Sequence, residues 1–252
     1  MTHAEPSRTA IEQAADALSL GGRFWFSRRN LYYELVRRGQ LPGPTAPGER
    51  DLGGLERALD AVERAAGPLA RLLRPERVPH TMALGDLPPD LFDYAVRRAV
   101  VLERLEPLLV LAQNGFHHRI EVALVTEDGF PEHVWAQLER QLAAGVATRF
   151  YALHDCTLEG YGLAARLRRR LRAAPSAKVL DIGLRVAHAL DLGLPLRRGP
   201  TPSLLPSESL DAQEQRMLGE GSYAELEELP PLEAMRFVYR RIARRVADAG
   251  FG

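Results

Sequence analysis

The sequence is poor in several features that mark particular classes of protein. It has a single cysteine, Cys156, so no disulfide can form within the chain, and we expect a reducing, cytoplasmic compartment. The formal net charge is +0, which removes global charge as an argument for nucleic-acid binding. No apolar run approaches transmembrane length, and the start MTHAEPSRTA lacks the apolar core of a signal peptide. We therefore expect no membrane partner.

What is present indicates a globular chain with local basic patches. Hydrophobic residues make up 46% of 252 residues, enough for one large or two small domains with a core. The basic residues are nearly all arginine, which makes bidentate phosphate contacts but can also reflect genome composition. Local charge can therefore matter on a chain that is neutral as a whole.

The first part of the chain reads as helical. Apolar residues recur with helical spacing, Ser27 is a good N-cap and Gly39 a good stop for the helix that it begins. The segment 40–50 is rich in proline and glycine and predicts a loop or wing. The expected helices cover residues 7–20, 27–38, 53–74 and 88–105.

After residue 105 the pattern changes to one of alternating strands and helices. Its β-β-α-β-α-β order indicates a mostly parallel sheet flanked by helices, so the fold class is α/β. In such sheets ligands bind beyond the carboxyl ends of the strands. The expected strands are 108–112, 122–125, 150–153 and 178–183, the helices are 131–144 and 158–173, and the polar residues at the strand ends are Gln113, Glu127, Asp128, Asp155 and Asp181.

The last fifty residues are expected to form a tail. Residues 199–209 resemble a linker, and helices are predicted at 209–219 and 231–248. The acidic stretch 224–233 either packs against a basic partner or is solvated, and solvation is the simpler expectation.

Two places resemble one known family. The segment 27-SRRNLYYELVRRG-39 resembles the motif in the winged-helix domain of topoisomerase VI A subunits and meiotic double-strand-break transesterases. The segment 124-LVTEDGFPEHVWAQLERQL-142, then 153-LHDCTLEG-160 and 181-DIGLRVAHALDLGLP-195, look like that family's Toprim domain. The resemblance covers roughly residues 10–200, and related architectures occur in the nuclease subunit of Wadjet plasmid-defence systems.

The resemblance implies an organisation and a mechanism. It implies a winged-helix-like DNA-binding domain over 1–105, a Toprim-like domain over 106–200, and a linker with C-terminal helices over 201–252. In the family a tyrosine attacks a DNA phosphodiester, and an acidic cluster holds Mg²⁺, which stabilises charge on the phosphate. It also implies DNA as partner, a homodimer in which each tyrosine faces the other copy's acids, and an ATPase subunit of the GHKL or SMC type.

Tyr33 matches the family's nucleophile. On a helix it falls off the apolar stripe and between Arg29 and Arg37, each four residues away, so a phosphate could approach it and Arg29 could favour its phenolate. The alternative is that Tyr33 packs against the wing or a neighbouring helix, as Tyr32 is expected to pack in the core.

The expected metal ligands are incomplete. Asp155 matches the first aspartate of the Toprim pair, but Thr157 replaces the second. The family's glutamate follows the first strand of the domain, where we place Gln113, which carries no charge. Glu127 and Glu159 are the candidate replacements, and Mg²⁺ bound by one carboxylate and water would be held weakly.

A second basic patch is expected on the helix after Asp155. It comprises Arg166, Arg168, Arg169 and Arg170, and it joins Arg28, Arg37 and Arg38 of the N-terminal helix as candidate phosphate contacts. A solvated outer helix explains it equally well. His117, His118 and His154 could bind a transition metal or be hydrogen-bonded histidines, and Cys156 reads as a small buried residue.

Three functions stay open from the sequence. The first is a Mg²⁺-dependent DNA-cleaving enzyme of the topoisomerase VI A or Toprim-nuclease kind. The second is a catalytically degenerate DNA-binding or structural subunit of a larger complex, which Gln113 and Thr157 favour. The third is a protein–protein scaffold that retains only the fold.

Overall fold

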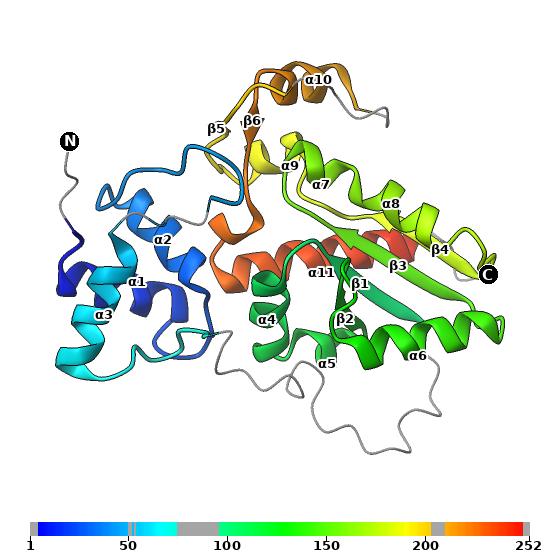
Figure 1. The fold of residues 1–252 in the computed structure, drawn as a ribbon, viewed down its shortest axis with the longest axis horizontal. Helices are drawn as coiled ribbons and strands as arrows, with labels where there is room; N and C mark the ends of the chain where they lie inside the picture. Colours follow the sequence, from blue (N-terminus) through cyan, green and yellow to red (C-terminus); the bar gives the residue numbers. More distant parts are fainter. Residues whose placement is uncertain (1–4, 50–51, 53, 75–95, 203–209, 249–252) are drawn as a thin grey trace.

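A parallel four-stranded sheet organises the larger part of the molecule. The computed structural model describes residues 5–49, 52, 54–74, 96–202 and 210–248. The strand order is β2-β1-β3-β4, with every pair parallel, and helices cover both faces (Figure 1). The predicted α/β class with a mostly parallel sheet is therefore confirmed. The strands are β1 (Arg98–Leu102), β2 (Ala123–Thr126), β3 (Thr148–Leu153) and β4 (Ala177–Asp181).

Alternate residues of each strand face different helical layers. Val101 and Phe150 point to the layer formed by α6 (Glu132–Ala143) and α8 (Leu163–Arg170). Val100 and Tyr151 point to the other layer, which includes α4 (Leu105–Gln113) and α11 (Pro231–Asp248). Burial on both faces explains why these strands are almost uninterrupted apolar runs.

The N-terminal unit is a three-helix cluster with its own core. Its helices are α1 (Arg8–Ser19), α2 (Arg28–Arg37) and α3 (Leu55–Ala66). Ser27 caps α2 and forms a capping box with Asn30, and Gly39 follows the helix with φ of +68°, as the sequence predicts. Within residues 5–49 and 54–74 we see no β-hairpin that would form a wing; Phe26 and Leu72 make one isolated bridge.

The remaining elements are short. They are α5 (Phe116–Ile120), α7 (Leu158–Tyr161), α9 (Val186–Asp191), β5 (Arg197–Arg198), α10 (Ala212–Gly219), β6 (Ser222–Tyr223) and the 3-10 helix η3 (Leu226–Glu228). β5 and β6 pair antiparallel. Across the described part of the chain, no helix combines the length and apolar character needed to cross a bilayer.

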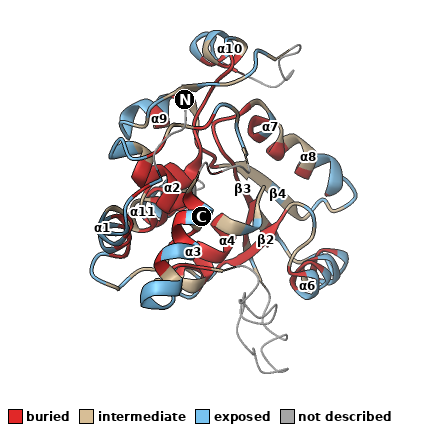
Figure 2. Ribbon diagram, turned by 60° about the vertical axis from the view of Figure 1, so that its left-hand side comes forward, coloured by how far each residue is buried: buried red, intermediate tan, exposed pale blue. Residues whose placement is uncertain are grey.

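The C-terminal part is integrated into the fold. From β6 the chain descends between α2 and the sheet, and α11 then crosses the face opposite α6 and α8 (Figure 1). The apolar residues Leu226, Leu229 and Val238 belong to the same core as the sheet. Figure 2 shows α2 and its surroundings as largely buried. The expected solvated stretch 224–233 is thus wrong, since residues 224–229 are all buried.

Two assignments from the sequence are also wrong. Residues 108–112, predicted as a strand, lie inside α4. This helix is buried on most sides, so its sequence lacks the regularly spaced polar residues by which a helix is recognised. Residues 98–102, predicted as helix, form β1 in the centre of the sheet, while 88–95 lie outside the described residues. The sheet therefore begins before residue 105, and the boundary between the units precedes β1.

Candidate functional site

Two carboxylates lie side by side at the carboxyl end of the sheet. Glu103 directly follows β1. Asp155 follows the neighbouring strand β3, with His154 between the strand and Asp155. The backbone N–H of Asp155 donates a hydrogen bond to Glu103 Oε2 at 2.9 Å. We call these two residues the carboxyl-edge pair. The residue after the domain's first strand is therefore Glu103, and the choice of Gln113 is wrong because Gln113 ends helix α4.

The carboxylate of Asp155 is fully engaged within the chain. Its Oδ2 accepts a hydrogen bond from Arg104 Nη2 at 2.6 Å, and its Oδ1 accepts one from the backbone N–H of Leu226 at 2.6 Å. Arg104 is the N-cap residue of α4, so one short turn after β1 supplies both Glu103 and the cation beside Asp155.

Glu103 has the electrostatics of a carboxyl held partly in the acid form. Burial and the nearby charge of Asp155 raise the pKa of Glu103 to about 7. A carboxyl with this pKa exchanges a proton near neutrality, which ordinary glutamates do not. The negative charge of Glu103 is therefore only partial near neutral pH.

The other predicted metal ligands lie elsewhere. Glu127 follows the outer strand β2 and forms a bidentate pair with Arg166, at 2.6 Å to Nε and 2.8 Å to Nη2. Glu159 is exposed on α7, and Thr157 caps that helix by accepting from the N–H of Gly160. Residues 5–49, 54–74, 96–202 and 210–248 contain no group of three metal-ligating side chains in reach of one ion. With Asp155 engaged by a guanidinium, the donor set does not fit Mg²⁺ in this arrangement.

A histidine–aspartate pair continues the edge towards β4. His154 Nε2 lies 3.0 Å from Asp181 Oδ1, and its Nδ1 lies 2.7 Å from the carbonyl of Asp155. Burial alone would lower the pKa of His154, but the hydrogen bond and charge of Asp181 raise it. Gly183 packs against the imidazole so closely that any Cβ there would clash. The histidine is thus a structural member of the edge and not a free ligand.

The remaining metal and nucleophile candidates are inert where they lie. His117 is buried with its ring tilted against that of His118, and burial lowers the pKa of His117 to about 4. Burial raises the pKa of the Cys156 thiol to about 12. The Cys156 thiol is therefore not the thiolate that nucleophilic attack requires. His117 is neutral, as a metal ligand must be, but it belongs to no group of three metal-ligating side chains within the described residues.

Tyr33 is buried, contrary to the position that its helical phase suggests. Its side chain is 1% exposed, and within the described residues its hydroxyl has no hydrogen-bond partner. The guanidinium groups of Arg29 and Arg197 lie 5.6 and 5.2 Å from its ring centroid. Burial, followed by the charge of Glu225, raises the pKa of Tyr33 well above its ordinary value. A DNA phosphate cannot reach the hydroxyl in this arrangement, because the C-terminal part of the chain covers that face of α2.

The cover over α2 is a buried network of acids and arginines that the sequence did not predict. Glu225 Oε1 accepts from Arg29 Nη2 and from the N–H of Gly48, both at 2.7 Å, and its Oε2 accepts from Arg29 Nε. Arg104 Nη2 lies 3.4 Å from the same carboxylate. We call residues 225–228 the acidic segment.

The other acids of this segment have partners of the same kind. Glu227 lies 3.2 Å from Arg104 and accepts from the Ser27 hydroxyl at 2.5 Å. Glu228 lies 3.0 Å from Arg197. Burial raises the pKa of Glu228, and it raises that of Glu227 to about 7 although Arg104 opposes the shift. We call Arg29, Arg104 and Arg197 the interface arginines.

The predicted phosphate contacts are largely paired within the chain. Arg28 lies 3.6 Å from Glu56, and both Arg37 and Arg38 pair with Glu34. Arg170 lies over the Trp135 ring at 3.9 Å and donates to the carbonyl of Glu127. Arg168 and Arg169 are exposed on α8, on the opposite face of the sheet from α4.

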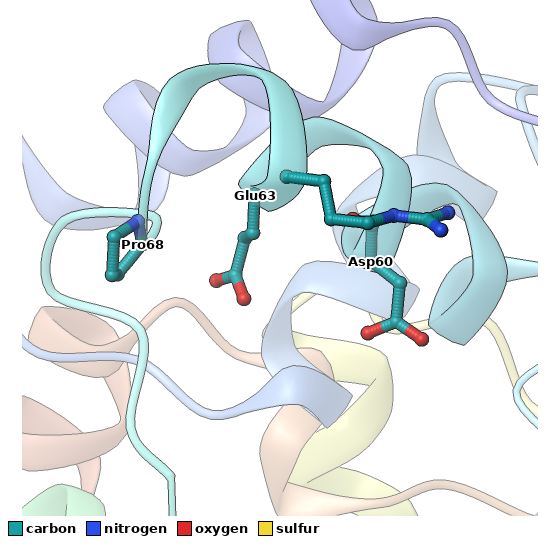
Figure 3. Close-up of a pocket in the computed structure, with 4 residues that line it drawn as sticks. Asp60, Glu63 and Pro68 are labelled. Atoms are coloured by element: carbon teal, nitrogen blue, oxygen red, sulfur yellow. The ribbon is translucent and has the colours of Figure 1, made fainter.

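A surface depression of about 460 Å³ lies on α3 and offers no better site. Asp60, Glu63, Arg64 and Pro68 line it (Figure 3). Glu63 is already paired with Arg74 and accepts from the N–H of Leu69 at 3.0 Å. The one half-buried acid of its lining is therefore already paired within the chain.

Comparison with known proteins adds no relative. No family model, curated protein or solved structure matches this chain.

Proposed function

We propose that this chain is a DNA-binding subunit with a helical N-terminal unit, which resembles a winged helix in the sequence of α2, and a Toprim-like α/β unit whose acidic site is closed. The observation that carries the proposal is the carboxyl-edge pair. Glu103 follows the first strand of a parallel 2-1-3-4 sheet, and Asp155 lies just after its neighbour, which are the positions that the resemblance assigns to the family's acids.

The state of this pair favours binding over cleavage. Arg104 and the N–H of Leu226 occupy both oxygens of Asp155, and Thr157 supplies no charge at the second aspartate position. Tyr33 is buried, and its raised pKa keeps the hydroxyl protonated. We derive no cleavage step from this arrangement, and a subunit of a larger DNA-processing complex, as a homodimer or with an ATPase partner, is the function that we propose.

Strand cleavage is the second candidate, and Glu103 is the observation that favours it. The sequence alone left one of three expected carboxylates, whereas the fold supplies two at the ends of neighbouring strands, with the backbone N–H of Asp155 donating to Glu103. If Arg104 moved away, both carboxylates would be open to a cation that prefers oxygen ligands.

A binding and cleavage assay separates these functions. Labelled duplex DNA is titrated at low and moderate salt, and supercoiled plasmid is incubated with Mg²⁺ or Mn²⁺. We expect binding that weakens steeply with salt and no nicking. Nicking that is lost in Glu103→Gln but kept in the exposed control Glu121→Gln would establish the second candidate. Absence of binding at low salt, both for the wild type and for Glu227→Gln/Glu228→Gln, would refute the proposal.

A further inference from the structure

The interface arginines converge from three separate parts of the chain. Arg29 lies on α2, Arg104 on the turn after β1, and Arg197 on β5. Their common counter-charge is the acidic segment, and nothing in the local sequence of any one of them predicts that they meet. Arg29 is 5% exposed and Glu225 is 0% exposed, so the contact is desolvated.

The contacts on Glu225 are those that proteins use for a phosphate group. A guanidinium binds it through two nitrogens, a backbone N–H donates from Gly48, and a second guanidinium from Arg104 lies close. Bidentate arginine together with backbone N–H is a recurring means of holding carboxylate and phosphate oxygens alike. Glu228, three residues further along the chain, pairs with the third arginine, Arg197.

We propose that the interface arginines form a binding site for the phosphate backbone of DNA, and that residues 225–228 occupy it as an internal counter-anion. This inference rests on the proposed function and names the site and its regulation. DNA gains access when the acidic segment moves out from between α2 and the sheet.

The segment is fastened strongly enough to make the closed state the resting one. Cys156 and Ala224 exchange two backbone hydrogen bonds of 2.9 and 3.1 Å, and Leu226 and Leu229 are buried in the core. Opening therefore exposes apolar surface as well as charge. DNA must compete with the segment, so the closed protein binds DNA more weakly than the arginines alone would allow.

The same movement would free the carboxyl-edge pair. The N–H of Leu226 is one of the two donors on Asp155, and Arg104, the other, is shared with Glu225 and Glu227. Withdrawal of the segment removes the first donor and releases Arg104 from two of its three acids. Phosphate binding and exposure of Asp155 are thereby coupled through one residue.

Charge removal from the segment is the first test. Glu227→Gln/Glu228→Gln is suitable because each replacement keeps the shape of the side chain, removes the charge that faces Arg104 or Arg197, and leaves Glu225 on Arg29. The control is Glu220→Gln/Glu233→Gln, which changes the net charge equally at surface acids that lie outside the network. We expect the first variant to bind duplex DNA about 5- to 150-fold more tightly than wild type, the range of typical coupling between sites. An equal gain in the control would overturn the proposal.

A reversible lock is the second test. In a hydrogen-bonded antiparallel pair the Cα atoms lie about 5.5 Å apart, within the range of a disulfide. Ala224→Cys can therefore be joined to the native Cys156, with the extent of oxidation measured by mass spectrometry after alkylation. We expect the oxidised protein to lose DNA affinity and the reduced protein to regain it, with Ala224→Ser as control.

The outcomes separate the two proposals. If wild type binds DNA and the oxidised lock binds equally well, the acidic segment is a structural brace and only this inference fails. If neither wild type nor the charge-reduced variant binds at low salt, DNA binding itself is refuted.

Discussion

Replacing Arg29 by methionine would measure how strongly the acidic segment is held. The side chains of Arg29 and Glu225 are 6% and 0% exposed, so loss of the guanidinium leaves a buried carboxylate with one backbone N–H and a more distant Arg104. Removal of one partner from a buried pair costs about 3–5 kcal/mol in unfolding free energy. Arg8→Met is the matched control, because the Arg8–Glu12 pair is 55% and 44% exposed and such pairs contribute about 0–1 kcal/mol.

The dependence on pH gives the same experiment a second readout. Burial would raise the pKa of Glu225, but the hydrogen bond and charge of Arg29 lower it in the native protein. In Arg29→Met the largest opposing effect is lost while Arg104 and the N–H of Gly48 remain, and we expect the folded-state pKa of Glu225 to rise above its unfolded value. The variant then loses stability as the pH increases above the ordinary range of glutamate, so its deficit relative to wild type is larger at pH 8 than at pH 5.

Urea denaturation followed by circular dichroism and tryptophan fluorescence is the assay. The double variant Arg29→Met/Glu225→Leu should recover most of the stability, since apolar replacement of both partners removes the unpaired charge. The reasoning is refuted if Arg29→Met shifts the urea midpoint no more than Arg8→Met does, or if its deficit is the same at both pH values.

Three further changes test other parts of the account. Burial raises the pKa of Glu227 to about 7, so the contribution of its protonated form to the free energy of unfolding is present at low pH and is lost as the pH rises through 7. Glu227→Gln should therefore flatten the pH dependence of the unfolding free energy between pH 5 and 8. An unchanged profile would contradict this. Tyr33→Phe removes a buried hydroxyl without a partner, so a calorimetric change beyond about 1 kcal/mol would be unexpected. Gly183→Ala should lower the unfolding free energy by about 1–3 kcal/mol, by displacing His154 from Asp181. Gly39→Ala, where only a φ of +68° is strained, should cost about 1 kcal/mol, and equal losses in both glycine variants would argue against the clash.

Much of the local structure could be predicted from the sequence. Ser27 and Gly39 set the limits of α2, and Pro131 lies at the start of α6 as expected. Residues 150–153 lie in β3, because apolar strand residues bounded by polar ones are recognisable without tertiary information. The order of strands and helices after residue 120 was recoverable for the same reason.

The centre of the sheet was not recoverable in this way. β1 and α4 are both short apolar segments, and their periodicities are hidden because each is buried on most sides. Because the strand was predicted as a helix and the helix as a strand, the position of the family's glutamate was assigned to Gln113 and not to Glu103. The acidic site was therefore predicted with one carboxylate too few. A glutamate immediately after the run 98-RAVVL-102 was the available signal.

The acidic segment was missed for a different reason. Three glutamates in four residues are typical of a solvated turn, and nothing local shows that Arg29, Arg104 and Arg197 lie around them. Tyr33 was predicted as exposed for the same reason. It lies off the apolar stripe of α2, and on a helix with one solvent-facing side that position would be exposed. Contacts between residues nearly 200 positions apart, such as Arg29 with Glu225, help to bury that face.

Amide hydrogen exchange across residues 222–229, with and without duplex DNA, tests most directly whether DNA displaces the acidic segment. In the closed protein the N–H groups of Ala224 and Leu226 are bonded to Cys156 and Asp155. We expect saturating DNA to accelerate their exchange while the amides of β3 stay protected. DNA that binds fully while these amides exchange as slowly as before, or more slowly, would contradict it.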